Sequence, residues 1–208
     1  MIAIIDYGVG NLRSIAKAFE NLGEKTVFAR GGKDILDADA VVLPGVGAFK
    51  PAVSLIIRNK LVRPLKEFAA SGRPMLGICL GMQLFFSESA EGGKSKGLNL
   101  IPGYVRKLPV KKLPQIGWNR VTKSGNGPSA KKSNILAGIP DNSYFYFVHS
   151  YFCAPADKRI VAATTRYGIN YPSIVQKGNV IGTQFHPEKS SLNGLRLLKN
   201  FCDTVTAK

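Results

Sequence analysis

The chain has few of the residues from which metal centres and disulfide networks are built. Its 208 residues include only two histidines, His149 and His186, and three cysteines, Cys79, Cys153 and Cys202. The cysteines are odd in number and show no CxxC spacing, so the sequence indicates neither a disulfide framework nor a zinc site. We therefore expect no metal and no cofactor, and the cysteine usage favours the reducing cytoplasm.

Long apolar runs are also absent. No stretch of about 18 uncharged apolar residues occurs, so we expect no membrane span. The first six residues, MIAIID, have no basic region ahead of their apolar run and reach an acid at once. This pattern predicts a first strand rather than a signal peptide, in keeping with a cytoplasmic protein.

Acidic residues are scarce relative to basic ones. The chain has 13 Asp and Glu against 29 Lys and Arg, a net charge of +16. Such an excess can indicate a nucleic-acid partner. The basic residues are scattered, however, and are not interleaved with aromatic side chains that would track a phosphate backbone. We therefore expect a solvated basic surface, suited to an acidic partner protein or a phosphorylated substrate, and no nucleic acid.

The length and composition suit one globular domain spanning residues 1–208. In the first half, apolar runs alternate with helical patterns, which predicts strands at 2–6, 26–29, 40–43 and 75–78 and helices at 52–57 and 61–70. A further helix is indicated by Leu12, Ile15, Ala16 and Phe19, which share one face, and Asn11 is placed to cap it. Continuous apolar strands joined by helices predict an α/β fold with three αβα layers around a mostly parallel sheet.

After about Gly97 the sequence changes to short β-type runs separated by glycine, proline and asparagine, which is typical of antiparallel strands. These runs are 105–108, 116–121, 144–148, 151–153, 160–165, 174–176 and 180–184. Residues 122–134 are polar and basic, and we expect an exposed loop there. A final helix is expected at 191–205, with Cys202 on its packed face.

Cys79 ends the apolar run 75–78, with Gly77 and Gly81 two positions to either side and a helix-compatible stretch after it. This is the pattern of a nucleophile elbow, a sharp strand-to-helix turn that exposes a reactive side chain. The N-terminus of the following helix would lower the thiol pKa and offer an N–H group to an oxyanion. The alternative is an inert buried cysteine, which is common between apolar residues.

A cysteine nucleophile needs a base, and His186 in the run His186-Pro187-Glu188 is the better candidate. It follows the predicted strand 180–184, and Pro187 restricts the backbone so that His186 and Glu188 keep a fixed relation. Glu188 would orient the imidazole, completing a cysteine–histidine–carboxylate set. The alternatives are a loop histidine and a helix-capping acid. The rival base, His149, lies in an aromatic run where a half-buried structural role is expected.

The run Pro44-Gly45-Val46-Gly47 follows another predicted strand. A glycine turn at the same sheet edge as Cys79 can present a second N–H donor to a tetrahedral intermediate. By itself the motif is equally compatible with an ordinary strand-to-helix loop.

Together these three motifs resemble the class I, triad-type glutamine amidotransferases, whose domain has a flavodoxin-like fold. Within that class the chain is similar, essentially end to end, to the glutaminase subunits of imidazole glycerol phosphate synthases in histidine biosynthesis. The stretches that carry the narrower resemblance are IIDYGVGNL at 4–12, GWN at 117–119, YFVHSY at 146–151 and QFHPEKS at 184–190.

The resemblance implies a chemistry. Cys79, activated by His186 and Glu188, would attack the carboxamide of glutamine, release ammonia and leave a thioester that water hydrolyses to glutamate. The residues it implies for holding the oxyanion and the substrate are the backbone of Leu80, Val46 and Gly47, and Gln83, Glu91, His149, Ser150 and Tyr151. Gln83 alone could equally be a surface residue.

The resemblance also implies a partner. In the narrower family, ammonia passes to a barrel-shaped cyclase (synthase) subunit of a heterodimer, which makes imidazole glycerol phosphate and an aminoimidazole carboxamide ribotide. The positions that match that interface are Asn11, Trp118, Tyr146 and Lys189. Trp118, the only tryptophan, could on sequence alone also belong to the core. The family often has histidine where this chain has Gln115.

Three alternatives stay open on the sequence. One is an amidotransferase subunit of another pathway, such as the anthranilate, carbamoyl phosphate or pyridoxal phosphate systems. Another is a stand-alone cysteine hydrolase on the same scaffold. The third is a non-catalytic subunit, which would be expected to lack Cys79, His186 or Glu188.

Overall fold

The computed structural model describes residues 1–125 and 135–206. A nine-stranded sheet runs through the molecule in the order β2-β1-β3-β4-β13-β12-β11-β8-β9. Its parallel half consists of β2 (Thr26–Ala29), β1 (Ile2–Ile5), β3 (Ala40–Leu43), β4 (Met75–Ile78) and β13 (Val180–Thr183). Its antiparallel half consists of β12 (Ile169–Lys177), β11 (Val161–Tyr167), β8 (Gln115–Lys123) and β9 (Ser143–His149).

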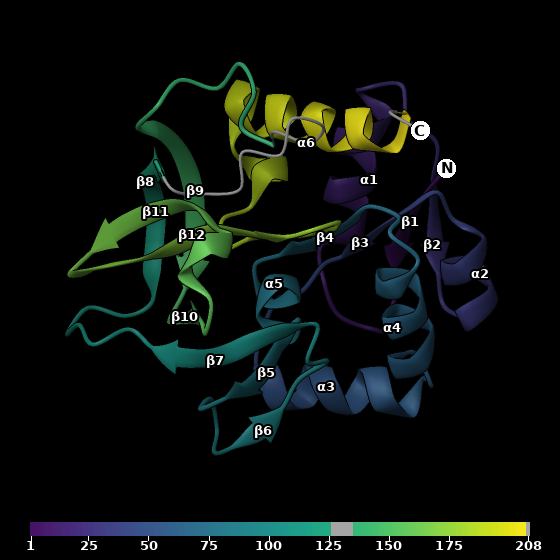
Figure 1. Cartoon of the computed structure of the whole chain (residues 1–208), viewed down its shortest axis with the longest axis horizontal. Helices are drawn as coiled ribbons and strands as arrows, with labels where there is room; N and C mark the ends of the chain where they lie inside the picture. Colours follow the sequence, from purple (N-terminus) through teal and green to yellow (C-terminus); the bar gives the residue numbers. More distant parts are fainter. Residues whose placement is uncertain (126–134, 207–208) are drawn as a thin grey trace.

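Helices cover both faces of the parallel half (Figure 1). Helices α1 (Leu12–Glu20) and α6 (Ser191–Thr206) lie on one face, and α3 (Phe49–Arg58), α4 (Val62–Ala70) and the short α5 (Leu80–Leu84) lie on the other. Alternate residues of one strand serve the two cores: Ile2 and Ile4 belong to the cluster of Phe19 and Phe201, whereas Ala3 and Ile5 belong to the opposite one. Because both faces are buried, the strand is apolar throughout. The predicted three-layer α/β fold is confirmed.

A second, four-stranded sheet lies beside the main one, with the order β10-β7-β5-β6. Its strands are β10 (Tyr151–Pro155), β7 (Ile101–Lys107), β5 (Phe86–Ser89) and β6 (Ser95–Lys96). The chain passes from β9 to β10 through the single residue Ser150, so the two sheets are joined directly. This junction is one wall of the site described below.

Three elements were not predicted from the sequence: α2 (Gly32–Asp37), β5 and β6. Helix α2 is too short to show a helical period, and its start depends on the Asp34 carboxylate, which accepts the N–H groups of Arg30 and Gly31 at 3.2 and 3.3 Å. Strand β5 has no apolar alternation from which it could be predicted. It is held in place by backbone pairing with β7 and β6. Helix α3 and strand β7 each begin earlier than predicted, at Phe49 and Ile101.

Two local expectations were wrong. Thr122 and Lys123 are not loop residues: they end β8, where Lys123 pairs with Ala163. Ser124 and Gly125 lie outside any helix or strand, and the remainder of the expected loop, at 126–134, lies outside the described residues. Asn11 occupies the N-cap position of α1, but its side chain makes no capping hydrogen bond.

In the part of the chain that the structure describes, no helix is long and apolar enough to cross a membrane.

The turn from β4 into α5 leaves almost no space around its backbone. Cys79, between the two elements, has φ 55° and ψ −109°. A Cβ atom added at Gly81 would lie 1.8 Å from the Leu43 carbonyl oxygen, and one at Gly77 would lie 2.5 Å from the Phe85 ring. The two glycines are therefore required because β3 and α5 approach the turn too closely for any side chain.

We predict that Gly81→Ala lowers the free energy of unfolding by about 3 kcal/mol or more, because the obstacle is a backbone carbonyl that cannot rotate away. Gly125→Ala is the matched control, since nothing lies within 4 Å of a Cβ added there. It should change stability by less than about 0.5 kcal/mol. Denaturant unfolding of both variants measures the difference, and equal stabilities would contradict the steric account of the turn.

Candidate active site

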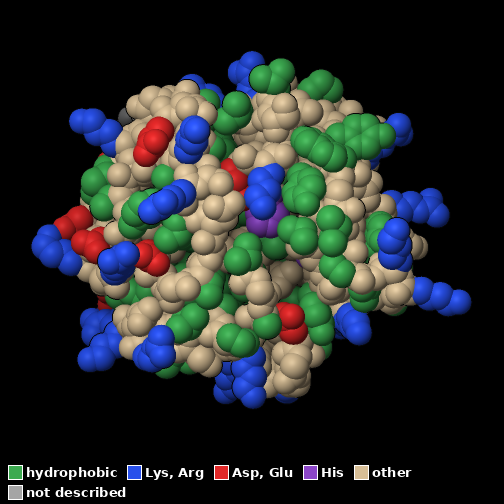
Figure 2. Space-filling view, turned by 180° about the vertical axis from the view of Figure 1, so that it is seen from behind, with side chains coloured by type: hydrophobic (Ala, Val, Ile, Leu, Met, Phe, Trp, Pro, Cys, Tyr) green, Lys and Arg blue, Asp and Glu red, His purple; other side chains and the backbone are tan. Residues whose placement is uncertain are grey.

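A cavity of about 330 Å³ opens where the carboxyl ends of β3, β4 and β13 meet. It is the position that an α/β sheet offers to ligands. All of its lining residues except Pro114 and Val148 were predicted from the sequence to take part in a site. The lining consists of Val46, Gly47, Cys79, Leu80, Gln83, Glu91, Pro114, Val148, His149, Ser150, Tyr151 and His186. In Figure 2 a histidine is visible beneath a Lys or Arg side chain, with hydrophobic side chains beside it and other Lys and Arg side chains dispersed over the face.

The Cys79 sulfur faces groups from both halves of the fold. It lies 3.8 Å from the Val148 carbonyl oxygen of β9 and 3.7 Å from Nε2 of Gln184, which follows β13. The other two cysteines lie in the cores, where burial raises the pKa of Cys153 well above its usual range and that of Cys202 to about 12. Of the three thiols, only that of Cys79 lines the cavity.

His186 and Glu188 form a buried pair beside Cys79. Nδ1 of His186 lies 2.8 Å from Oε1 of Glu188, and both side chains are almost fully buried. Burial alone would lower the pKa of His186, but its interactions with Cys79 and Glu188 outweigh this and raise the pKa to about 10. Its other ring nitrogen, Nε2, has no hydrogen-bond partner among the described residues. Glu188 therefore orients the ring and leaves Nε2 available for proton transfer.

The backbone of His186 is fixed to β9. Its N–H donates to the Tyr146 carbonyl at 2.9 Å, and its own carbonyl accepts the Ser190 hydroxyl at 2.6 Å. The same hydroxyl oxygen accepts the N–H of Tyr146 at 3.0 Å. Strand β9 thus holds the histidine from two directions.

His149 is buried more deeply than the half-buried position expected for it, and it is held at both ring nitrogens. Nδ1 lies 2.8 Å from the Tyr151 carbonyl and Nε2 lies 3.1 Å from the Tyr171 hydroxyl. Burial lowers its pKa to about 4, so the ring is neutral at physiological pH. Neither ring nitrogen of His149 is available to take a proton from Cys79. This is consistent with the structural role predicted for His149. Among the described residues, no group of three or more His, Cys, Asp or Glu side chains could hold a metal ion.

Gln83 and Glu91 also line the cavity. Gln83 is buried, so the surface alternative for it was wrong, and its Nε2 donates to the Tyr151 carbonyl at 3.0 Å. Glu91 reaches the start of α3, where its carboxylate accepts the N–H of Phe49 at 2.9 Å. A polar side chain that is held in place in this way can present a fixed oxygen to a ligand.

The turn after β3 packs directly on the start of α5. Gly45 is so close that an added Cβ would lie 2.8 Å from the Leu80 Cβ, and the Tyr7 hydroxyl donates to the Pro44 carbonyl at 2.9 Å. Gly47 has a φ of +90°, which favours glycine. Val46, Gly47 and Leu80 therefore line the same cavity as Cys79.

Besides Pro114 and Val148, three residues that contact the site were not predicted from the sequence: Tyr7 below the turn, Tyr171 behind His149, and Gln184 against Cys79. Gln184 stands two residues before His186, and the period of two in an extended strand would have placed both side chains on one side. The contacts of Tyr7 and Tyr171 depend on how distant elements pack, and the local sequence holds no signal for them.

Trp118, Tyr146 and Lys189 form a surface cluster outside the cavity, in which Trp118 and Lys189 are exposed and Tyr146 is half-buried. Trp118 and Tyr146 pair across β8 and β9 with ring centroids 6.2 Å apart, and the Lys189 ammonium lies 5.9 Å from the Tyr146 ring. Trp118 is 53% exposed, which excludes the core alternative. Ile116 and Tyr144, on the same strands, are also exposed. Asn11 lies on the loop between β1 and α1, at the carboxyl edge of the parallel strands.

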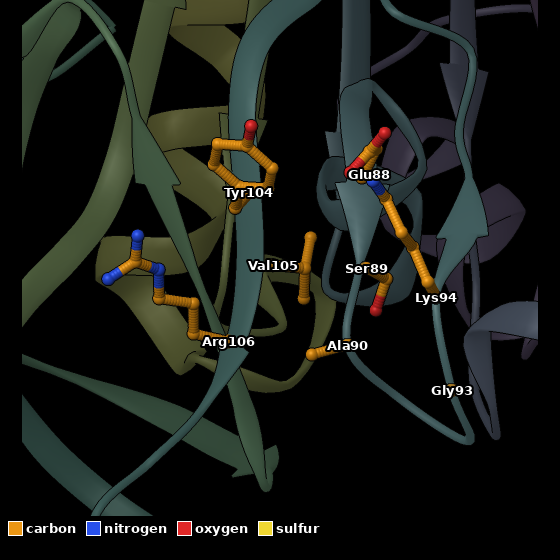
Figure 3. A pocket seen from close by; sticks show the side chains of 8 residues that line it. All are labelled: Glu88, Ser89, Ala90, Gly93, Lys94, Tyr104, Val105 and Arg106. Carbon is orange, nitrogen blue, oxygen red and sulfur yellow. Dashed lines mark ion pairs between the residues drawn. The ribbon is translucent and has the colours of Figure 1, made fainter.

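A second hollow, of about 390 Å³, lies on the small sheet between β7 and the β5–β6 hairpin. In Figure 3, Val105 projects from β7 toward β5, while Lys94 reaches Glu88, with which it forms an ion pair of 3.2 Å. Neither histidine nor any cysteine lines this hollow. The nucleophile and base lie together only in the cavity at Cys79.

Comparisons with known proteins identify the family of the chain. Residues 3–205 match the model of the family "Glutamine amidotransferase class-I". The chain is 46% identical over 208 residues to a protein of Bacillus mycoides and 47% identical over 206 residues to one of Chlorobaculum tepidum, each named imidazole glycerol phosphate synthase subunit HisH. The alignments cover 100% and 98% of this chain and 96% and 100% of those proteins.

Among solved structures, PurLQS from Thermotoga maritima shares the fold with a TM-score of 0.74 at 19% identity, covering 97% of this chain and 96% of that one. This chain belongs to the class I glutamine amidotransferases and, within them, to the family of the HisH subunits of imidazole glycerol phosphate synthase.

Proposed function

We propose that the chain hydrolyses glutamine to glutamate and ammonia with Cys79 as nucleophile, and supplies the ammonia for imidazole glycerol phosphate synthesis in histidine biosynthesis. The observation that carries the proposal is the shared cavity of Cys79 and His186, with His186 bound to Glu188 at 2.8 Å. The names of its relatives support the pathway.

The reaction begins when His186 takes the proton of Cys79 and the sulfur attacks the carboxamide carbon of glutamine. The tetrahedral intermediate collapses, the carbon–nitrogen bond breaks, and His186 returns the proton to the departing ammonia. Water, deprotonated by His186, then attacks the γ-glutamyl thioester, releasing glutamate and restoring the thiol. Glu188 stabilises the imidazolium at each stage, and such acid–base assistance contributes about 10²–10⁴ in rate.

The oxyanion is held by backbone N–H groups. Leu80 is the first residue of α5, so its N–H has no acceptor within the helix. The turn of Val46 and Gly47 supplies the second donor from across the cavity. Loss of one such donor typically raises the barrier by about 3–4 kcal/mol.

Gln83 and Glu91 hold the amino-acid end of the substrate. Nε2 of Gln83 donates to Tyr151 O and to Gln184 Oε1, so both of its N–H groups are engaged and its carbonyl oxygen is left to accept from the substrate ammonium. Glu91 adds a negative charge for the same group. The backbone of His149, Ser150 and Tyr151, at the junction of the two sheets, binds beside it.

The partner is a cyclase barrel, with which the chain forms a heterodimer in the cytoplasm. The surface cluster of Trp118, Tyr146 and Lys189 is the proposed contact, with Asn11 at the same edge. Exposed aromatic side chains of this kind favour a protein interface. The Tyr146 carbonyl accepts the N–H of His186, so a partner bound to the cluster would also affect the position of the catalytic base. The barrel uses the ammonia to make imidazole glycerol phosphate and an aminoimidazole carboxamide ribotide.

We predict that Cys79→Ala lowers glutamine-dependent synthesis, in the presence of the cyclase subunit, by more than about 10³-fold, because no other thiol reaches the cavity. Synthesis from ammonium salt should be unchanged, since the barrel and its interface stay intact. Cys202→Ala, in α6, is the control and should retain both activities. Glutaminase activity that survives in Cys79→Ala would contradict the mechanism.

We also predict that Trp118→Ala weakens binding of the cyclase barrel by about 2 kcal/mol, about 30-fold in Kd, because an exposed tryptophan at an interface centre contributes strongly. Tyr104→Ala is a matched control: Tyr104 is exposed to almost the same extent, at 52% against 53%, but lies on the small sheet. Isothermal titration calorimetry gives both values. An equal loss in the two variants, or none in either, would show that the interface lies elsewhere.

A further inference from the structure

The carboxamide of Gln184 lies between the nucleophile and a residue assigned to substrate binding. Its Nε2 is 3.7 Å from the Cys79 sulfur, and its Oε1 accepts the Nε2–H of Gln83 at 3.2 Å. Gln184 is fully buried, and its backbone N–H donates to the Ser173 carbonyl of β12 at 2.9 Å. The backbone of Gln184 is therefore fixed to the sheet.

The orientation of the Gln184 carboxamide follows from the Tyr151 carbonyl, to which it is linked through Gln83. The Tyr151 carbonyl can only accept, so the group that faces it at 3.0 Å must be the NH₂ end of Gln83. The second N–H of that same group then faces Gln184, which must answer with its oxygen. Its own NH₂ end is consequently turned toward the sulfur of Cys79. In the reverse orientation of Gln184, its NH₂ group would face the NH₂ group of Gln83, and its carbonyl oxygen would face the thiolate of Cys79. Each contact would then join two donors or two acceptors.

We propose that Gln184 is a positioning residue of the glutaminase site, which holds an N–H donor on the Cys79 sulfur and ties that sulfur to Gln83. The inference rests on the proposed function for the role of Gln83, but its contact with Cys79 stands on geometry alone. An N–H aimed at sulfur favours the thiolate over the thiol, because only the charged form is a strong acceptor. It also restrains the side chain of the nucleophile at the strained turn.

The chain of amides gives the substrate a route to the nucleophile. When the glutamine ammonium donates to Gln83, that amide is polarised, and its N–H becomes a stronger donor to Gln184. Gln184 is polarised in turn and stabilises the thiolate more strongly. The thiolate is thus favoured most when the substrate occupies the cavity.

The test is the pH dependence of alkylation of Cys79 by iodoacetamide, followed by peptide mass spectrometry on the full chain without glutamine. In Gln184→Met and Gln184→Leu, which keep the volume but remove the N–H, the midpoint of the profile should rise by about one pH unit. With glutamine and the cyclase subunit, kcat should fall about tenfold. Two variants are used so that either can decide the outcome if the other does not fold.

Gln115→Met is the control, because Gln115 is also a buried amide, hydrogen-bonded to Tyr171 at 2.9 Å but not to Cys79. A role in folding alone would lower the melting temperature in all three variants and move no midpoint, which would overturn the proposal. A midpoint that rises only in the Gln184 variants supports it. Because alkylation needs no glutamine, such a rise in a chain without glutaminase activity would contradict the proposed function and leave the contact of Gln184 with Cys79 intact.

Discussion

The backbone of Cys79 is held in a conformation that a non-glycine residue rarely adopts, and the site is arranged around it. Strain of this kind costs of the order of 1–3 kcal/mol and persists only where neighbouring structure enforces it. Here the N–H of Cys79 donates to the Thr183 carbonyl at 2.7 Å, and Gly81 lies against the Leu43 carbonyl. The strands on both sides of β4 therefore fix the turn. Their continuations also carry the other groups of the site, the glycine turn after β3 and His186 beyond β13.

Strand β9 brings the antiparallel half of the fold into the same site. Its Val148 carbonyl faces the Cys79 sulfur, and its Tyr146 carbonyl accepts the N–H of His186. The outer side of the same strand, with its neighbour β8, carries the surface pair of Trp118 and Tyr146. One strand therefore contacts the nucleophile, the base and the proposed partner surface. This continuity is a physical reason for the partner and the glutaminase site to influence each other.

The parallel half and the motifs around Cys79, His186 and Pro44 could be predicted from the sequence because they depend on local signals, whereas Gln83, Glu91 and residues 149–151 were implied only by the family resemblance. Apolar runs predict β1, β3 and β4, and the spacing of Gly77, Cys79 and Gly81 predicts a turn whose steric need the structure explains. The small sheet was only partly predicted, because β5 and β6 are polar and depend on pairing with a distant strand. The orientation of Gln184 and the contact of His149 with Tyr171 depend on the packing of several elements, which local patterns do not encode.

The proposed reaction requires that the sulfur of Cys79 forms a covalent bond with glutamine. The most direct measurement is acid quenching of the chain with the cyclase subunit during glutamine turnover, followed by peptide mass spectrometry. We predict a γ-glutamyl adduct on the peptide that contains Cys79, and none on the peptides of Cys153 and Cys202, whose thiols are buried in the cores. Turnover with the adduct on either of those cysteines, or with a modified residue other than cysteine, would contradict it.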